Sequence, residues 1–311
     1  MTDQPLSESK LHSRFDHLGR GLSDRVLLSP GDDMAMLHLD DSGHLLVAAD
    51  QVVIGRHVRL DEDPHAIGRK AVLRNLSDVA AMAAKPIATI ATATLSPRRS
   101  HAWAEQLHAG LHETGLAFDA PLIGGDLATH IREDSADVIA VTILAIPALP
   151  ANRVISRKGV EAGDLLAVTG RLGGSLDSAG GGRHLDFPPR LEEAIQLAEL
   201  LGPDLVAMLD VSDGVARDAG RLAAAGGLDA RITAAKLPCN PGCGWKEAVG
   251  DGEDYELLFA CRRQPPAMLN GVPVTVIGRF VETANPPGAV KIEVDGIIRS
   301  ISDLGWEHAG F

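Results

Sequence analysis

Apolar runs and stretches of helical spacing alternate along the first half of the chain. A turn at residues 40–43 is expected to join the first two strands, and Pro64 suits the first turn of the helix that follows. The strands are expected at 35–39, 44–50, 87–95 and 137–147, and the helices at 64–86 and 101–116. This order predicts an α/β unit that ends near Pro150.

The second half continues the alternation after a segment, 147–164, that is rich in proline, glycine and mixed charge. The strands are expected at 164–170, 206–210, 255–261 and 272–278, and the helices at 190–202 and from Ser212. Asp295-Gly296 predicts a hairpin within 291–301. We therefore expect two domains, 1–150 and 151–311, with the boundary in the segment 147–164.

Composition narrows the class of protein. Hydrophobic residues make up 45% and charged residues 23% of the chain, and the net charge is −13. This acidic balance argues against a nucleic-acid surface. Neither a signal peptide nor a membrane span is expected, so the sequence predicts a soluble, cytoplasmic protein. Cys239, Cys243 and Cys261 are expected to be reduced thiols, since no second cysteine pair completes a zinc site.

Acidic residues recur beside the predicted elements. They are Asp32, Asp33, Asp50, Asp78, Asp126, Asp210, Asp213, Glu253 and Asp254. Each alone is consistent with a turn or a helix cap; Ser212 suits an N-cap, and Asp213 suits the first turn of the helix after it. Together, with glycines that allow close backbone approach, they predict one acidic pocket.

Such a pocket needs cations, because carboxylates a few ångströms apart raise each other's pKa. Magnesium prefers oxygen ligands and completes its shell with phosphate oxygens and water, so the pattern favours a nucleotide held through metal ions. The P-loop, the protein-kinase motifs, the serine elbow, HExxH and a GxGxxG fingerprint after a strand are all absent.

Six segments in order resemble one family. They are GDDMAML, IGRKAVLRNLSDVAAMAAKP, LIGGD, SRKGVEAGDLLAVTG, MLDVSDGVARDAGRLA and GEDYELLF. They are similar to thiamine-monophosphate kinase, in the ATP-binding superfamily that includes aminoimidazole ribonucleotide synthetase. The resemblance implies a two-domain α/β (α+β) fold, in which N-terminal mixed sheets pair into a dimeric barrel. It also implies a homodimer and magnesium-dependent transfer from ATP to thiamine monophosphate, giving thiamine diphosphate.

The resemblance also implies roles for individual residues. The magnesium ligands would be Asp33, Asp50, Asp78, Asp126, Asp210 and Asp213. The ATP contacts would be Gly125, Asp126, Arg157 and Ser212, and the thiamine contacts His57, Glu253 and Trp306. No general base is expected, because the accepting phosphate is already ionised near neutral pH. Alternatively, Arg157 is a solvated surface residue and Trp306 packs the C-terminus.

One stretch departs from the family pattern. Ala48 and Ala49 precede Asp50 where the family usually has hydroxyl residues, and Gln51 follows it. Alanine offers no side-chain oxygen to a metal ion. A related enzyme with another phosphorylated acceptor, or a nucleotide-binding dimer with weakened turnover, therefore stands as an alternative.

Overall fold

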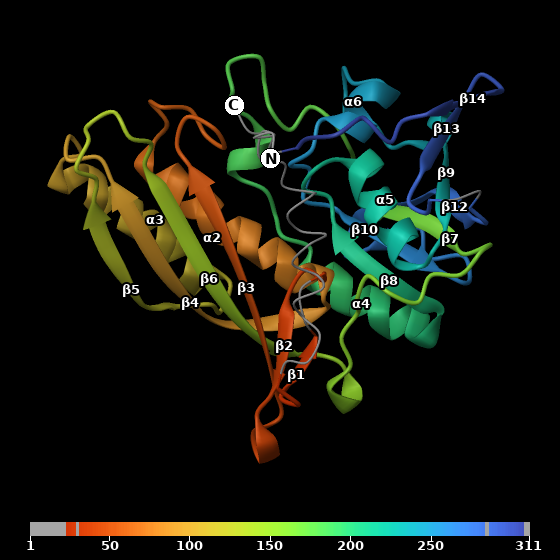
Figure 1. Cartoon of the computed structure of the whole chain (residues 1–311), viewed down its shortest axis with the longest axis horizontal. Coiled ribbons are helices and arrows are strands. Elements are labelled where there is room, and N and C mark those ends of the chain that lie inside the picture. Colours follow the sequence, from red (N-terminus) through yellow and green to blue (C-terminus); the bar gives the residue numbers. More distant parts are fainter. Residues whose placement is uncertain (1–22, 29–30, 284–285, 308–311) are drawn as a thin grey trace, which may run out of the picture.

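The computed structural model describes residues 23–28, 31–283 and 286–307, which form two sheets flanked by helices (Figure 1). The first sheet has six strands in the order β1-β2-β3-β6-β4-β5. Its strands are β1 (Val26–Leu28), β2 (Ala35–His38), β3 (His44–Val53), β4 (Ala84–Leu95), β5 (Leu122–Thr129) and β6 (Val138–Pro147). The pairs are antiparallel except for β4 with β5, so the sheet is mixed.

Helices α2 (Pro64–Ala81) and α3 (His101–Ala117) cover one face of this sheet. Leu46, Val52 and Ile143 are fully buried on that face, beneath the helices. The opposite face carries Ala49, which pairs with Thr142, and Thr142 pairs in turn with Ile90. Side chains alternate between the faces of a strand, so Asp50 points toward α2 and Ala49 away from it.

The second sheet has eight strands. Seven follow the order β14-β13-β9-β12-β7-β10-β8, and β11 pairs with β12. They are β7 (Leu165–Thr169), β8 (Leu205–Asp210), β9 (Asp229–Thr233), β10 (Leu257–Cys261), β11 (Met268–Leu269), β12 (Val272–Val281), β13 (Val290–Val294) and β14 (Ile297–Ser300). The helices of this half are α4 (Leu191–Leu201), α5 (Val215–Ala225) and α6 (Trp245–Gly250). Short 3-10 helices occupy Asp40–Ser42, Pro150–Asn152, Arg183–Leu185, Gly202–Asp204 and Ala234–Lys236.

The predicted α/β class is confirmed, as is the hairpin at Asp295-Gly296. The predicted end of the first long helix was wrong: α2 ends at Ala81, and Pro86 lies inside β4. Ala83 has φ of +50°, a left-handed conformation that turns the chain from helix to strand. Strand β5 was not expected, because its glycines and polar residues weaken the apolar pattern.

The helix expected from Ser212 begins instead at Val215, with Gly214 as its N-cap. Ser212 is therefore not the N-cap, and Asp213 precedes the helix. Within the described residues, none of the helices combines the length and apolar character that crossing a membrane requires. All three cysteines are free thiols, as expected.

Candidate active site

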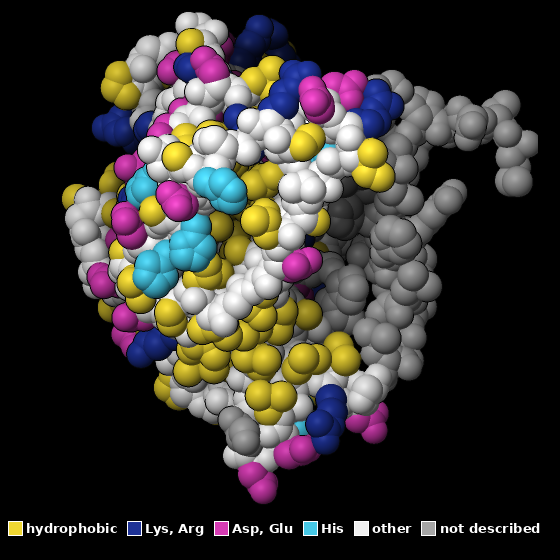
Figure 2. All heavy atoms as spheres, turned by 90° about the vertical axis from the view of Figure 1, so that its left-hand side faces the viewer, with side chains coloured by type: hydrophobic (Ala, Val, Ile, Leu, Met, Phe, Trp, Pro, Cys, Tyr) yellow, Lys and Arg dark blue, Asp and Glu magenta, His cyan; other side chains and the backbone are white. Residues whose placement is uncertain are grey.

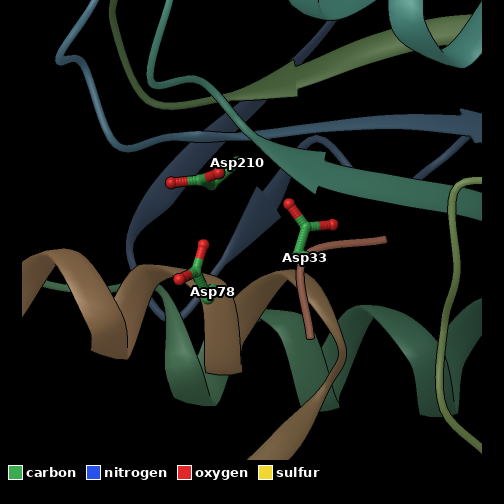
Figure 3. Close-up of side chains that lie close together, drawn as sticks. All are labelled: Asp33, Asp78 and Asp210. Carbon is green, nitrogen blue, oxygen red and sulfur yellow. The ribbon is translucent and has the colours of Figure 1, made fainter. Parts of the chain in front are cut away.

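Three carboxylates from distant parts of the chain meet between the two sheets (Figure 3). Asp33 precedes β2, Asp78 lies on α2, and Asp210 ends β8. One oxygen from each lies within 4.8 Å of the others. These three residues were all predicted metal ligands, and the structure brings them together.

Neighbouring donors fix this carboxylate cluster in place. Ser77 Oγ donates to Asp210 at 2.6 Å. The Arg157 guanidinium donates to both oxygens of Asp33, at 2.6 and 3.2 Å, and the Arg157 amide donates to Asp32 at 2.7 Å. Arg157 is therefore a structured part of the site and not a solvated surface residue.

Burial makes the cluster electrostatically costly. Burial, reinforced by the charges of Asp50 and Asp210, raises the pKa of Asp78 well above its usual range. Burial and the charge of Asp33 raise the pKa of Asp210 to about 8. A divalent cation would remove this repulsion, and carboxylate oxygens are the ligands that magnesium prefers. The donor set therefore fits magnesium.

Asp50 lies beside the cluster without joining it. Its carboxylate is 3.1 Å from Arg74 Nη2, and its amide donates to Asn75 Oδ1 at 3.1 Å. It lies close enough to Asp78 to raise the pKa of that carboxyl group. A guanidinium thus faces the carboxylate that was predicted to bind metal.

Asp213 and Asp126 are placed apart from the three carboxylates. Asp213 forms an ion pair with Arg221, which also pairs with the buried Asp218 at 2.6 Å. Asp126 is exposed on β5, in a cross-strand row with Thr92, Ala140 and Gln51. This row lies on the sheet face opposite to that of Asp50.

Two of the predicted ATP contacts are set by close backbone approach. A Cβ atom on Gly125 would lie 1.9 Å from the Ala91 carbonyl oxygen, so β5 needs glycine there. The Ser212 carbonyl accepts from the Glu253 amide at 2.7 Å. Gly252 has φ of +71° at this crossing, where a side chain would be strained.

Two of the three predicted thiamine contacts, His57 and Glu253, meet at Lys70, and Trp306 lies beside His57. Lys70 Nζ donates to the His57 carbonyl and to Glu253 Oε2, at 2.8 Å each. The rings of His57 and Trp306 have centroids 6.1 Å apart. His184 Nδ1 lies 2.9 Å from Glu253. Two segments nearly 200 residues apart are thereby joined at one ion pair.

Lys70 and Glu253 each influence the pKa of the other. Burial lowers the pKa of Lys70 to about 8, although Glu253 opposes the shift. Burial opposes the charge of Glu253, but hydrogen bonds from His184 and Lys70 lower its pKa to about 2. Glu253 also has φ of +51°, a conformation that is uncommon outside glycine and that concentrates at functional sites.

Four residues of the site were not predicted: Lys70, Arg74, Ser77 and His184. Lys70 and Arg74 stand eight and four residues before Asp78, so all three share one face of α2. That spacing could have identified the two cations from sequence. Ser77 contacts Asp210, 133 residues away, and His184 contacts Lys70, 114 residues away. No local sequence pattern reveals such distant contacts.

Residues 31–146 match the family model described as AIR synthase related protein, N-terminal domain. Thiamine-monophosphate kinase of Rhodopirellula baltica is 33% identical over 83% of this chain and 84% of its own length. The chain belongs to the thiamine-monophosphate kinase family. The Escherichia coli member is 31% identical over 91% of this chain and 92% of its own.

A solved structure of this family shares the fold. It is described as AaThiL complexed with AMPPCP and TMP, and it aligns with a TM-score of 0.75 and 25% identity, covering 97% of each chain. Family membership agrees with the prediction from the six sequence segments. The roles of the individual residues, including Asp33, Asp78 and Asp210 as magnesium ligands, stay predictions.

Proposed function

We propose that this chain transfers a phosphoryl group from ATP to thiamine monophosphate, giving thiamine diphosphate. The observation that carries the proposal is the carboxylate cluster of Asp33, Asp78 and Asp210, in a member of the thiamine-monophosphate kinase family. Helix α2 connects this cluster to the group formed by His57, Glu253 and Trp306. An AMPPCP and TMP complex of a related protein supports the same pair of substrates.

We infer that Asp33, Asp78 and Asp210 hold magnesium. When bound, the cations would neutralise phosphate charge and so reduce the repulsion between two polyanions. The proposed reaction needs no general base, since the accepting phosphate is ionised near neutral pH. The protein's task is to position the two phosphates in line.

Arg157 is suited to the donor phosphates. Its guanidinium donates two hydrogen bonds to the Asp33 carboxylate. A planar guanidinium binds phosphate in the same bidentate geometry. We infer that Arg157 exchanges Asp33 for ATP when the nucleotide binds. Glu253, held ionised by Lys70 and His184, and Trp306 would orient the cationic, aromatic thiamine.

We further propose that the active molecule is a homodimer. Asp126 is on the opposite face of the first sheet from Asp50, and strands β6 and β4 separate the two residues' strands. Asp126 can therefore join the carboxylate cluster only from a second chain. Hydrophobic side chains gather on the N-terminal half in Figure 2, and Ile90 and Leu144 belong to the sheet face that α2 does not cover. A second copy would bury this face.

The domain assignment remains part of the proposal. Residues 1–150 would supply the dimer face and most magnesium ligands, and residues 151–311 would close over nucleotide and substrate. Contacts between the two, such as Arg157 with Asp33 and Lys70 with Glu253, support this division of labour.

The test is product formation. Purified protein is incubated with ATP, thiamine monophosphate and magnesium, and thiamine diphosphate is quantified by chromatography. Magnesium-dependent product should fall at least about a hundredfold in Asp78→Asn, because under the proposal the Asp78 carboxylate acts on the phosphates through the magnesium ion that it holds. Arg263→Lys, in an exposed ion pair far along the chain, is the control.

Absence of thiamine diphosphate from the wild-type reaction would contradict the assignment. If ATP still binds in a magnesium-dependent manner, a related enzyme acting on another phosphorylated acceptor, or a dimer with weakened turnover, becomes the better description. Binding of ATP without turnover of any phosphorylated acceptor would indicate the dimer with weakened turnover and not the related enzyme.

A further inference from the structure

Two polar atoms near Asp50 are buried without a hydrogen-bond partner among the described residues. They are Arg74 Nε and the hydroxyl of Tyr255. Tyr255 is only 3% exposed. Leaving a buried donor unpaired costs about 1–3 kcal/mol, so such atoms are rare in native proteins and need a reason.

Both terminal nitrogens of the Arg74 side chain have a partner. Nη2 pairs with Asp50 at 3.1 Å, and Nη1 donates to the Gln51 carbonyl at 2.9 Å. These contacts fix the plane of the guanidinium, whereas its Nε–H has no partner among the described residues. Burial opposes its charge, but the neighbouring Tyr255 and Asp50 raise the pKa of Arg74 above its usual value, so it stays a cation.

Tyr255 is equally fixed. Its ring stacks on Phe187 with centroids 3.9 Å apart and planes inclined by 8°. Its amide donates to the Val211 carbonyl at 2.9 Å. Burial raises the pKa of Tyr255 well above its usual range, so the phenol keeps its proton and remains a donor. Lys70, one helical turn before Arg74, binds Glu253, which stands two residues before Tyr255, so the two unpaired donors belong to one region.

Helix α2 shows what lies on either side of this region. Lys70, Arg74 and Asp78 follow one another at four-residue intervals on one helix face, about 6 Å apart along the axis. Lys70 contacts His57 and Glu253, and Asp78 belongs to the carboxylate cluster. Arg74 stands between them on the helix, and under the proposed function the phosphate of thiamine monophosphate would lie between these two groups.

We propose that Arg74 Nε–H and the Tyr255 hydroxyl form a binding subsite for the phosphate of the acceptor, an inference that rests on the proposed function. A cation and a neutral donor together suit a phosphate oxygen, and a charge-assisted bond is the stronger kind. Arg74 also serves as the fixed counter-cation of Asp50, where Ala48 and Ala49 offer no side-chain oxygen to a metal ion.

The test compares thiamine monophosphate with thiamine, which lacks the phosphate. Affinities for both are measured by calorimetry, with magnesium and a non-hydrolysable ATP analogue present, in the wild type, Tyr255→Phe and Arg74→Lys. Each variant should reduce the preference for the phosphorylated ligand by about tenfold and leave the affinity for thiamine unchanged. Arg74→Lys keeps a cation opposite Asp50, so its loss reports the missing Nε–H. Arg263→Lys should match the wild type.

A stability measurement distinguishes this role from a structural one. Tyr255→Phe removes a hydroxyl that has no partner among the described residues, so the free energy of unfolding should stay the same or rise. Tyr255 is also the only tyrosine of the chain. Protein labelled with fluorotyrosine should therefore give one fluorine NMR resonance, which shifts with thiamine monophosphate much more than with thiamine.

The proposal is overturned if both variants keep the wild-type preference, or if Tyr255→Phe weakens folding while that preference is unchanged. If the protein makes thiamine diphosphate and gives either result, the subsite is ruled out but the proposed function is not. A wild type that neither makes thiamine diphosphate nor prefers thiamine monophosphate over thiamine would instead overturn both.

Discussion

Asp210 shows what a single residue contributes to this site and what it costs. Its carboxyl group is buried, receives a hydrogen bond from Ser77 and faces Asp33 and Asp78. In the absence of cations, burial and like charge favour the protonated form. The same features that destabilise the metal-free protein prepare the carboxylates for a divalent ion.

This cost predicts how stability depends on pH. Because the pKa of Asp210 is raised from 3.8 to about 8, the folded protein binds a proton more tightly than the unfolded chain does. The resulting stabilisation is complete below the unfolded value and is lost as the pH rises toward 8. In EDTA, the free energy of unfolding should therefore fall, on the order of 4 kcal/mol, between about pH 5 and pH 8.

Urea unfolding at several pH values measures this slope. Asp210→Asn cannot titrate, so its slope should be shallower than that of the wild type. Saturating magnesium should also flatten the wild-type slope, because the cation favours the ionised carboxylates. Equal slopes for the wild type and Asp210→Asn in EDTA would show that Asp210 does not carry the effect.

At the scale of elements, α2 organises the site because it is packed closely and begins at a defined residue. The Asp63 carboxylate accepts from the Ala66 amide at 3.0 Å, and Pro64 occupies the first turn. Glycines let α2 and α3 approach: a Cβ atom on Gly68 would lie 2.3 Å from the Leu107 carbonyl oxygen. The position of α3 thus fixes where α2 presents its charged face.

Gly68→Ala tests this packing through the sign of its effect. Helix propensity alone would make the substitution stabilising by about 1 kcal/mol. The clash with the α3 backbone should instead destabilise the protein by about 1–3 kcal/mol, and the shift of α2 should weaken magnesium-dependent activity. Thermal unfolding and the thiamine diphosphate assay measure the two effects. A more stable Gly68→Ala protein would contradict the close approach.

The elements that sequence patterns located correctly are those with strong local signals. Helix α3 was predicted at 101–116, and the hairpin followed from Asp295-Gly296. Local patterns failed where distant contacts decide. The alanine-rich end of α2 looks helical, yet Ala83 turns the chain into β4, which pairs with β5 and β6. Segment 211–212 pairs with 253–256 and so delays the start of α5.

At the scale of the whole molecule, the sequence predicted the acidic site but not its arrangement. Asp33, Asp78 and Asp210 meet as expected. Asp213 pairs with Arg221, and Asp126 lies on the far side of a sheet. Periodicity cannot reveal an ion pair or a sheet face that only the complete fold creates. If Asp126 is a magnesium ligand, as the resemblance implies, its placement requires a second chain.

The most direct measurement is therefore complementation between two inactive chains. Asp78→Asn and Asp126→Asn are purified separately, mixed under conditions that exchange subunits, and assayed for thiamine diphosphate. Each alone should be inactive. If Asp126 serves the site of its partner, random mixing restores one intact site in each mixed dimer, giving about a quarter of wild-type activity. A mixture as inactive as its components, although mixed dimers have formed, would contradict a site built from two chains.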